Sequence, residues 1–279
     1  MKVDGVRILS VAWDSGHRGR RMGAGPLRLL DAGVLDRLRR AGHDVDHVPV
    51  EPETSFPAEV ATTFELARGL SRRVREAVDA GLRPLVLSGG CGSAAGTVAG
   101  LGADDVGVVW FDAHGDLNTP ETTTSGFVDG TAAAALLGRC WTALTASIPG
   151  FAPVDPRRVA FVGLRDLDPA EEAWLGAADA ARPSVRTLGA TLERMVAAGA
   201  RRLYVHVDVD VLDPAVARVN PYQAPDGLAL EELLGAIHSI GARLGVAAGA
   251  VASFDPAVDR DGRGTEAALR VVEALAGAG

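Results

Sequence analysis

The segment VGVVWFDAHGD, residues 106–116, joins a largely apolar run to a cluster of charged side chains. Its first part lacks alternating polar positions, which is typical of a parallel strand buried on both faces. The same pattern recurs in LYVHVDVDVLD, residues 203–213, where a second run ends in acidic residues. In an open parallel sheet, ligands bind beyond the carboxyl ends of the strands. The two segments therefore predict both the core of a sheet and its functional edge.

Further apolar runs alternate with segments of helical periodicity along the chain. The runs cover residues 6–13, 85–87, 158–164 and 246–254, and the helical segments cover 26–41, 59–80, 188–198, 230–243 and 265–276. This alternation predicts an α/β fold with one doubly wound, mostly parallel sheet. No repeat, low-complexity linker or break in composition divides the sequence. We therefore expect a single domain over residues 1–279.

The composition excludes several classes of protein. With 47% hydrophobic residues and a net charge of −8, the chain can bury a core, and nucleic acid or an anionic membrane is not an expected partner. The uncharged stretch 84–103 contains six glycines, which favours a strand followed by a Gly-rich loop over a membrane span. Two cysteines are too few for a disulfide framework, and no signal peptide precedes the first run. We therefore expect a cytoplasmic protein.

The acidic residues beyond the two strands have the spacing of metal ligands. Asp112, His114 and Asp116 alternate, as do Asp208 and Asp210, so we expect each set to project from one face of its strand. Crowded carboxylates resist ionisation unless cations neutralise them, and a set that includes one imidazole favours Mn²⁺ over Ca²⁺. One such motif alone is more often a solvated loop. Two of them, each after a buried strand, predict a dinuclear centre that can supply a hydroxide nucleophile.

With these motifs in place, the chain resembles the ureohydrolase family of arginases, agmatinases and formiminoglutamases. The resemblance rests on DAHGDLNTP (112–120), TTTSG (122–126), GLRDLDP (163–169) and DVDVLDP (208–214), and on Gly25-Pro26 with the helix after it. It extends from about residue 9 to the last helix. It implies a three-layer α/β/α domain with a sheet of about eight strands and two Mn²⁺ ions at its edge.

The resemblance also implies roles for individual residues. Asp112 and Asp208 would bridge the two ions, Asp116 would complete one site, and His114 and Asp210 the other. In the family a metal-bridging hydroxide attacks the guanidino carbon, and Asp116 would relay the proton. The polar set with which arginases hold an α-amino acid corresponds to Asn118, Thr123, Ser125, Asp168 and Glu171. A plain polar turn at 122–125 is the alternative, but the spacing favours an L-amino acid substrate over agmatine.

Two departures from the family concern metal binding and proton transfer. Cys91 stands where the family has a histidine ligand, in a register set by Gly96-Thr97, and a thiolate can bind a metal. A buried free cysteine is the alternative, and it is our interpretation of Cys140. Asp129 stands where arginases place a proton-shuttling histidine. It is the candidate catalytic group there, although an ionised carboxylate is a weak acid toward an amine.

The third departure concerns the guanidino group. Ser253 occupies the position of a family glutamate that faces this cation, and Asp255, two residues further on, is a partial substitute. Tyr222, in the loop 220–223, is expected either to line the substrate pocket or to pack over it. The softer Cys91 ligand should also raise the affinity for Zn²⁺ or Fe²⁺ relative to Mn²⁺.

These departures favour a substrate that is less basic than arginine. The oxygen of an N-hydroxyguanidine withdraws electrons, so this group needs less counter-charge. We therefore expect hydrolysis of Nω-hydroxy-L-arginine to L-ornithine and hydroxyurea, a preference found in the branch of the family that serves D-cycloserine biosynthesis. The alternatives are an ordinary arginase, another guanidino-acid ureohydrolase, and a non-catalytic metal-binding homologue. Arginase trimers use a C-terminal tail that is missing here, so we expect a monomer.

Overall fold

The computed structural model describes residues 5–54 and 58–279. Its centre is a sheet in the order β4-β1-β5-β9-β8-β6-β7, in which every neighbouring pair is parallel. The strands are β1 (Gly5–Val11), β4 (Asp44–Pro49), β5 (Leu82–Ser88), β6 (Val106–Phe111), β7 (Val159–Val162), β8 (Arg202–Asp208) and β9 (Val246–Ala252). Two short strands, β2 (Trp13–Asp14) and β3 (His17–Arg18), form a separate antiparallel pair.

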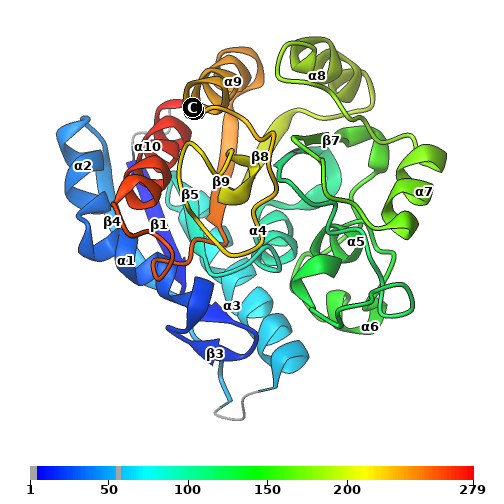
Figure 1. The fold of residues 1–279 in the computed structure, drawn as a ribbon, viewed down its shortest axis with the longest axis horizontal. Helices are drawn as coiled ribbons and strands as arrows, with labels where there is room; N and C mark the ends of the chain where they lie inside the picture. The colour runs from blue at the N-terminus through cyan, green and yellow to red at the C-terminus, as the bar shows by residue number, and fades with distance from the viewer. Residues whose placement is uncertain (1–4, 55–57) are drawn as a thin grey trace.

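Helices cover both faces of this sheet (Figure 1). One face carries α1 (Gly25–Asp31), α2 (Val34–Arg40), α8 (Leu188–Ala197), α9 (Leu230–Leu244) and α10 (Arg263–Gly277). The other carries α3 (Glu59–Asp79), α4 (Ser93–Leu101), α5 (Ala132–Leu136) and α7 (Pro169–Ala177), with the short α6 (Thr142–Thr145) beside them. The predicted three-layer α/β/α architecture is thus confirmed.

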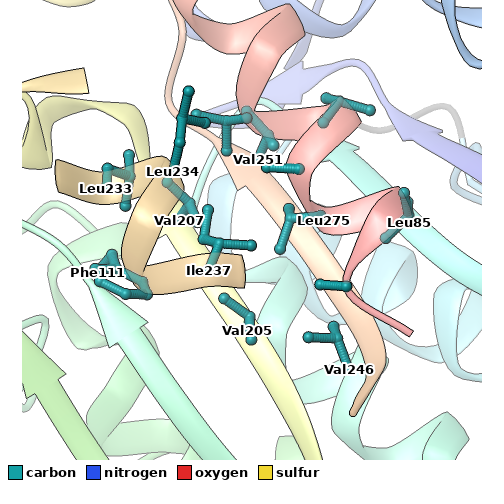
Figure 2. Close-up of a cluster of buried hydrophobic side chains, with 14 of the residues drawn as sticks. Leu85, Phe111, Val205, Val207, Leu233, Leu234, Ile237, Val246, Val251 and Leu275 are labelled. Carbon is teal, nitrogen blue, oxygen red and sulfur yellow. The ribbon is translucent and has the colours of Figure 1, made fainter. Parts of the chain in front are cut away.

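The two core layers follow from alternation along the strands. In β6, Val109 and Phe111 face α8 and α9, whereas Val108 and Trp110 face the opposite helices. Successive side chains of a strand point to opposite faces, so a wholly apolar strand fits a sheet with helices on both sides. Figure 2 shows the first layer, where Ile237 of α9 lies over the strands.

The structure departs from the sequence prediction in several elements. Residues 26–41 form two helices because Gly33 adopts φ +83°, a left-handed conformation that ends α1 and begins α2. The loop expected after residue 88 becomes the buried helix α4 from Ser93. Edge strand β4 and helix α7 were not predicted. An eighth strand is represented by one residue, since Ala181 forms a parallel bridge with Ala160 at the edge of β7.

No helix within residues 5–54 or 58–279 is both long enough and apolar enough to cross a membrane. The prediction that the stretch 84–103 is not a span agrees with its division between β5 and α4.

Truncating a core side chain should measure how much this packing stabilises the fold. Ile237 is fully buried between α9 and the sheet. We expect Ile237→Ala to lower the free energy of unfolding by about 2–5 kcal/mol, measured by urea denaturation, because it leaves a cavity. The control is Val196→Ala at an exposed position of α8, which should change stability by less than about 0.5 kcal/mol. Equal effects of both variants would contradict this account of the core.

Candidate metal centre

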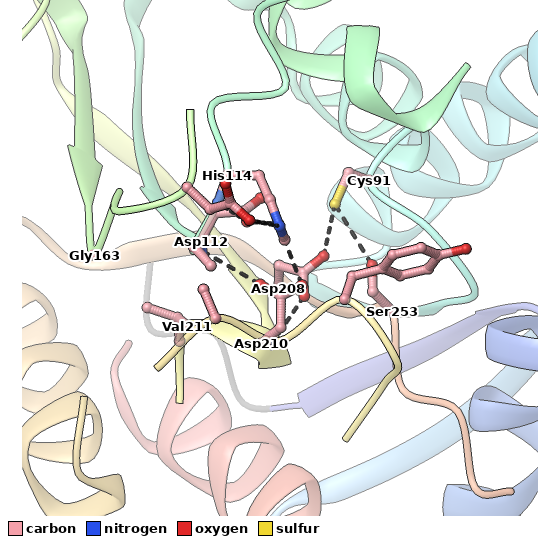
Figure 3. Close-up of polar contacts among 12 residues, drawn as sticks. Cys91, Asp112, His114, Gly163, Asp208, Asp210, Val211 and Ser253 are labelled. Carbon is pink, nitrogen blue, oxygen red and sulfur yellow. Dashed lines mark hydrogen bonds and ion pairs between the residues drawn. The ribbon is translucent and has the colours of Figure 1, made fainter. Parts of the chain in front are cut away.

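Four neighbouring strands deliver the site to one edge of the sheet. The strands β5, β9, β8 and β6 are adjacent and parallel, so their carboxyl ends lie side by side. Cys91 follows β5, Ser253 follows β9, Asp208 is the last residue of β8, and Asp112 directly follows β6. Figure 3 shows these side chains converging from separate strands. The central position in the sheet therefore explains why residues far apart in sequence meet here.

The predicted ligands form two adjoining groups that share one carboxylate. Oxygen and sulfur atoms of Cys91, Asp112 and Asp116 lie within 4.8 Å of one another, as do ligand atoms of Asp112, His114 and Asp210. Asp208 joins them through its Oδ2, which lies 3.1 Å from Cys91 Sγ. This is the arrangement that two neighbouring ions with a common ligand, Asp112, would need. Cys91 and Asp116 fall on one side of it, and His114 and Asp210 on the other.

Local turns aim the ligands, and they differ from the expected extended strand. The chain leaves β8 at Asp208 and enters a 3₁₀ turn, Val209–Val211, because Asp208 Oδ1 accepts the N–H of Asp210 at 2.9 Å. Asp112 Oδ1 likewise accepts the N–H of His114 at 2.8 Å. Such aspartate turns bend the backbone within two residues. Asp208 and Asp210 therefore reach the site around a turn and not from one face of a strand.

Buried donors hold the carboxylates from behind. Trp110 Nε1 donates to Asp112 Oδ2 at 3.0 Å. Asn220 Nδ2 donates to Asp210 Oδ2 at 3.1 Å and to the carbonyl of Ser253 at 3.0 Å, so it ties the end of β9 to the turn after β8. Outer hydrogen bonds of this kind fix the orientation of metal ligands. Asn220 and Trp110 were not among the predicted site residues, because neither motif points to them.

The electrostatics of the site favour cations. Burial, with the repulsion of neighbouring carboxylates, raises the pKa of Asp116 and of Asp208 well above the usual range, and burial with the charge of Asp210 raises the pKa of Asp112 to about 6. Burial also raises the pKa of the Cys91 thiol, as do Asp116 and Asp208. Asp116 Oδ2 is buried and has no hydrogen-bond partner among the described residues. A buried acceptor without a partner beside a shared carboxylate fits a divalent metal.

His114 is the cationic counterpart within the cluster when no metal is bound. Burial disfavours its charge, but contacts of 3.4 Å with Asp112 and with Asp210 raise its pKa to about 12. A metal ligand needs a neutral imidazole, so a bound ion takes over the role of this proton. The donor set of carboxylates, one imidazole and one thiol therefore fits two divalent cations.

A cavity of about 290 Å³ lies over the centre. Its wall includes most of the residues predicted to bind substrate, namely Asn118, Ser125, Asp168, Glu171, Tyr222 and Ser253, and also Asp129. Thr123 is an exception. It accepts the N–H of Gly126 and lies 3.4 Å from Ser125 Oγ, while Thr124 lines the cavity in its place. The hydrogen bonds within residues 122–125 decide which threonine faces the cavity, and the spacing of the sequence does not show this.

Glu171 and Asp168 begin α7 and connect it to the metal motif. Glu171 accepts the backbone N–H of Leu117 at 2.8 Å and that of Asp168 at 2.9 Å, and Asn118 Nδ2 donates to Asp168 at 2.8 Å. Both oxygens of Glu171 thus hold backbone groups. Both residues line the cavity, but Glu171 is engaged with two backbone N–H groups, whereas Asp168 accepts from the side-chain amide of Asn118.

The end of β9 places a hydroxyl beside the thiol. Ser253, at φ +64°, lies with Oγ 3.6 Å from Cys91 Sγ. Asp255 does not line the cavity, and its Oδ1 accepts the N–H of Ala257 at 2.9 Å. The prediction that Asp255 partly replaces a charged group facing the substrate is therefore wrong.

Three loops meet at the mouth of the cavity. The guanidinium of Arg21 lies 5.8 Å from the ring centre of Phe127 and 5.9 Å from that of Tyr222, and it donates to the Tyr222 hydroxyl. Arg21 also pairs with the buried Asp14 at 3.3 Å. Tyr222 was expected either to line the cavity or to pack over it; in the structure it lines the cavity and also stacks with Phe127 at its mouth. Arg21 and Phe127 carried no motif that would have identified them.

The comparisons with known proteins agree with this geometry. The model of the arginase family matches residues 4–277. The chain is similar to an arginase of Bacillus caldovelox, at 34% identity over 76% of this chain and 78% of that protein, and to one of Agrobacterium fabrum, at 33% over 86% and 80%. The crystal structure of the Bacillus caldovelox arginase superposes with a TM-score of 0.89 and 26% identity over 98% of both chains. A formimidoylglutamase of Bacillus subtilis shares the fold, with a TM-score of 0.74 and 18% identity over 100% of this chain and 88% of that one.

Removing metal should make stability depend on pH in a defined direction. In the metal-free protein folded Asp112 keeps its proton up to a pKa of about 6, whereas an unfolded aspartate titrates near about 4. The folded state then binds more protons, so the free energy of unfolding should fall as pH rises from about 4 to about 6. Saturating divalent metal should raise the melting temperature above pH 6 and reduce this slope. Urea titrations with and without metal measure it, and identical curves would contradict the metal assignment.

Proposed function

Because the chain belongs to the arginase family, and is therefore a metal-dependent hydrolase of guanidino groups, we propose that it cleaves Nω-hydroxy-L-arginine to L-ornithine and hydroxyurea. The observation that carries the choice of substrate is the pair of Cys91 and Ser253 beside the shared carboxylates. In this part of the cavity wall the Ser253 hydroxyl is uncharged, and the charge of a Cys91 thiolate that binds metal would be neutralised by the ion, so neither group offers a full counter-charge to a guanidinium. We propose D-cycloserine biosynthesis as the pathway.

An N-hydroxyguanidine suits this wall better than a guanidinium does. Its oxygen lowers the basicity of the group, so less counter-charge is needed to bind it. Its hydroxyl can also exchange hydrogen bonds with Ser253, whose Oγ faces the cavity beside Cys91. A site with a hydrogen-bonding group for a substrate hydroxyl discriminates against the analogue that lacks it.

We further propose that the centre holds two Mn²⁺ ions. Cys91, Asp112, Asp116 and Asp208 would hold one, and Asp112, His114, Asp208 and Asp210 the other. When bound, such ions activate water as a nucleophile at neutral pH. Besides its place in the metal set, the buried Asp116 carboxylate would relay a proton during the reaction. Asp168, with Asn118 and Ser125, would bind the amino-acid head of the substrate at the cavity wall.

The alternative is hydrolysis of L-arginine to L-ornithine and urea. It is favoured by the names of the relatives, since the proteins of Bacillus caldovelox and Agrobacterium fabrum are both arginases. The substrate differs from the proposed one by a single oxygen atom, so the two functions are separated by selectivity and not by the type of reaction.

A direct comparison of substrates tests the proposal. The Mn²⁺-loaded protein is incubated separately with Nω-hydroxy-L-arginine and with L-arginine, and the released ornithine is quantified. We expect kcat/KM to be higher for the hydroxylated substrate by about tenfold or more, which is about 1.4 kcal/mol in transition-state stabilisation. Efficient release from arginine would establish the alternative. Release from neither substrate would favour a non-catalytic homologue.

Exchanging the thiol tests its part in selectivity. Cys91→His supplies a neutral ligand that leaves the metal centre more positive and favours harder metals. We expect the ratio of kcat/KM for the hydroxylated substrate over arginine to fall by about tenfold, with both ions still bound. Cys140→Ala is the control, because Cys140 is buried away from the cavity. An unchanged ratio in Cys91→His would remove the thiol from the explanation of selectivity.

Removing one carboxylate charge tests recognition of the amino-acid head. Asp168→Asn keeps a side chain that can cap α7 but loses the charge that would pair with an ammonium. We expect KM for the hydroxylated substrate to rise about tenfold or more, with a smaller change in kcat. Glu172→Gln, on the exposed side of the same helix, should leave KM unchanged. If Asp168→Asn also leaves it unchanged, the substrate is a guanidino acid without this amino group.

A further inference from the structure

The loop that carries Cys91 is short and rich in glycine. Residues 89–92 join β5 to α4 and contain three glycines around the cysteine. Among the described residues the hydrogen-bond contacts of the Cys91 side chain are with groups of the centre itself, Asp208 and Ser253. No hydrogen bond from outside the centre holds the sulfur there, so the backbone of the loop contributes to its position.

Asp129 provides that restraint from another part of the chain. Its Oδ1 accepts the N–H of Gly92, which belongs to the peptide that joins Cys91 to Gly92, at 2.8 Å. Gly90 packs directly against the carboxylate, because a Cβ at that residue would lie 2.2 Å from Asp129 Oδ2. The carboxylate thus contacts the loop on both sides of Cys91. It also lies at the N-terminus of α4, where negative charge is stabilised.

The backbone of Asp129 is anchored independently of this loop. Asp129 begins a 3₁₀ turn, Asp129–Thr131, in which the Thr131 hydroxyl donates to the carbonyl of Val128 at 2.6 Å. Trp141 Nε1 in turn donates to the Thr131 hydroxyl at 2.9 Å. The hydrogen bond from Asp129 therefore fixes the distance between the loop 89–92 and the turn 129–131. Because this restraint acts on the backbone next to Cys91, it helps to set the position of the cysteine sulfur.

From these contacts we infer that Asp129 is a positioning residue, which holds the Cys91–Gly92 backbone so that the thiol points at the shared carboxylates. The inference rests on the proposed metal set. It replaces the expectation that Asp129 transfers a proton in catalysis, because the carboxylate is engaged with the backbone N–H of Gly92 and packed against Gly90 in the ligand loop. It also gives a reason for a glycine at residue 90, where any larger side chain would displace the carboxylate.

Spectroscopy of Co²⁺-loaded protein separates the two roles. A cysteine thiolate bound to Co²⁺ gives a sulfur-to-metal charge-transfer band in the near ultraviolet, which reports the ligand without turnover. Asp129→Asn keeps an oxygen that can accept the N–H of Gly92, whereas Asp129→Ala keeps none. We expect Asp129→Asn to retain the band and to hold kcat within about threefold, and Asp129→Ala to lose at least about half of the band at equal metal content. Asp104→Asn, an exposed aspartate at the opposite edge of the sheet, is the control for the loss of a charge.

The outcomes distinguish a positioning role of Asp129 from a role as proton donor. A full band in Asp129→Ala would overturn the inference. So would a full band in Asp129→Asn together with a loss of about 100-fold or more in kcat, which is the signature of a proton donor. If Asp129→Ala does not fold, Asp129→Asn alone decides, because it must retain both band and turnover. A wild-type protein that binds two Co²⁺ ions without the band would instead refute Cys91 as a ligand, and with it this part of the proposed function.

Discussion

The constraint on which the rest of the structure depends is the packing of four aspartates and a thiol at the carboxyl ends of adjacent strands. Asp112, Asp116, Asp208 and Asp210 lie close together and buried, with His114 as the cationic side chain of the cluster. Repulsion within such a group opposes folding. The apolar layers on both faces of the sheet and the hydrogen bonds behind the carboxylates offset it. Metal binding and fold stability are therefore linked in this protein.

The sequence predicted those features that depend on neighbours along the chain. Buried strands appear as apolar runs, and five of the ligand candidates follow two of these runs closely, so the sheet and these five were found together, whereas Cys91 was identified through the resemblance to the family. Features that depend on distant contacts were not. The position of Thr124 in the cavity wall depends on the hydrogen bonds within the turn 122–125. β4 is a half-exposed edge strand, and its aspartates interrupt the apolar run by which the other strands were predicted. The break at Gly33 is local, yet helical periodicity continues across it.

The contacts at the mouth of the cavity also could not be predicted from the sequence, because they join distant segments. Arg21 meets Phe127 and Tyr222 from loops separated by as many as 201 residues, and the contact exists only because the strands place these loops at one edge. The guanidinium beside these two stacked rings brings positive charge to the entrance of a cavity whose floor is acidic. Positive charge at this place attracts anionic groups and repels cations.

The three departures from the family pattern lie in contact with one another. Asp129 accepts the N–H of the peptide that joins Cys91 to Gly92, and Cys91 Sγ lies 3.6 Å from Ser253 Oγ. Residues in contact do not act additively, so these positions are best regarded as one unit. The substrate preference proposed for this protein would therefore depend on the three residues together, because Asp129 holds the loop that carries Cys91 and Cys91 lies beside Ser253.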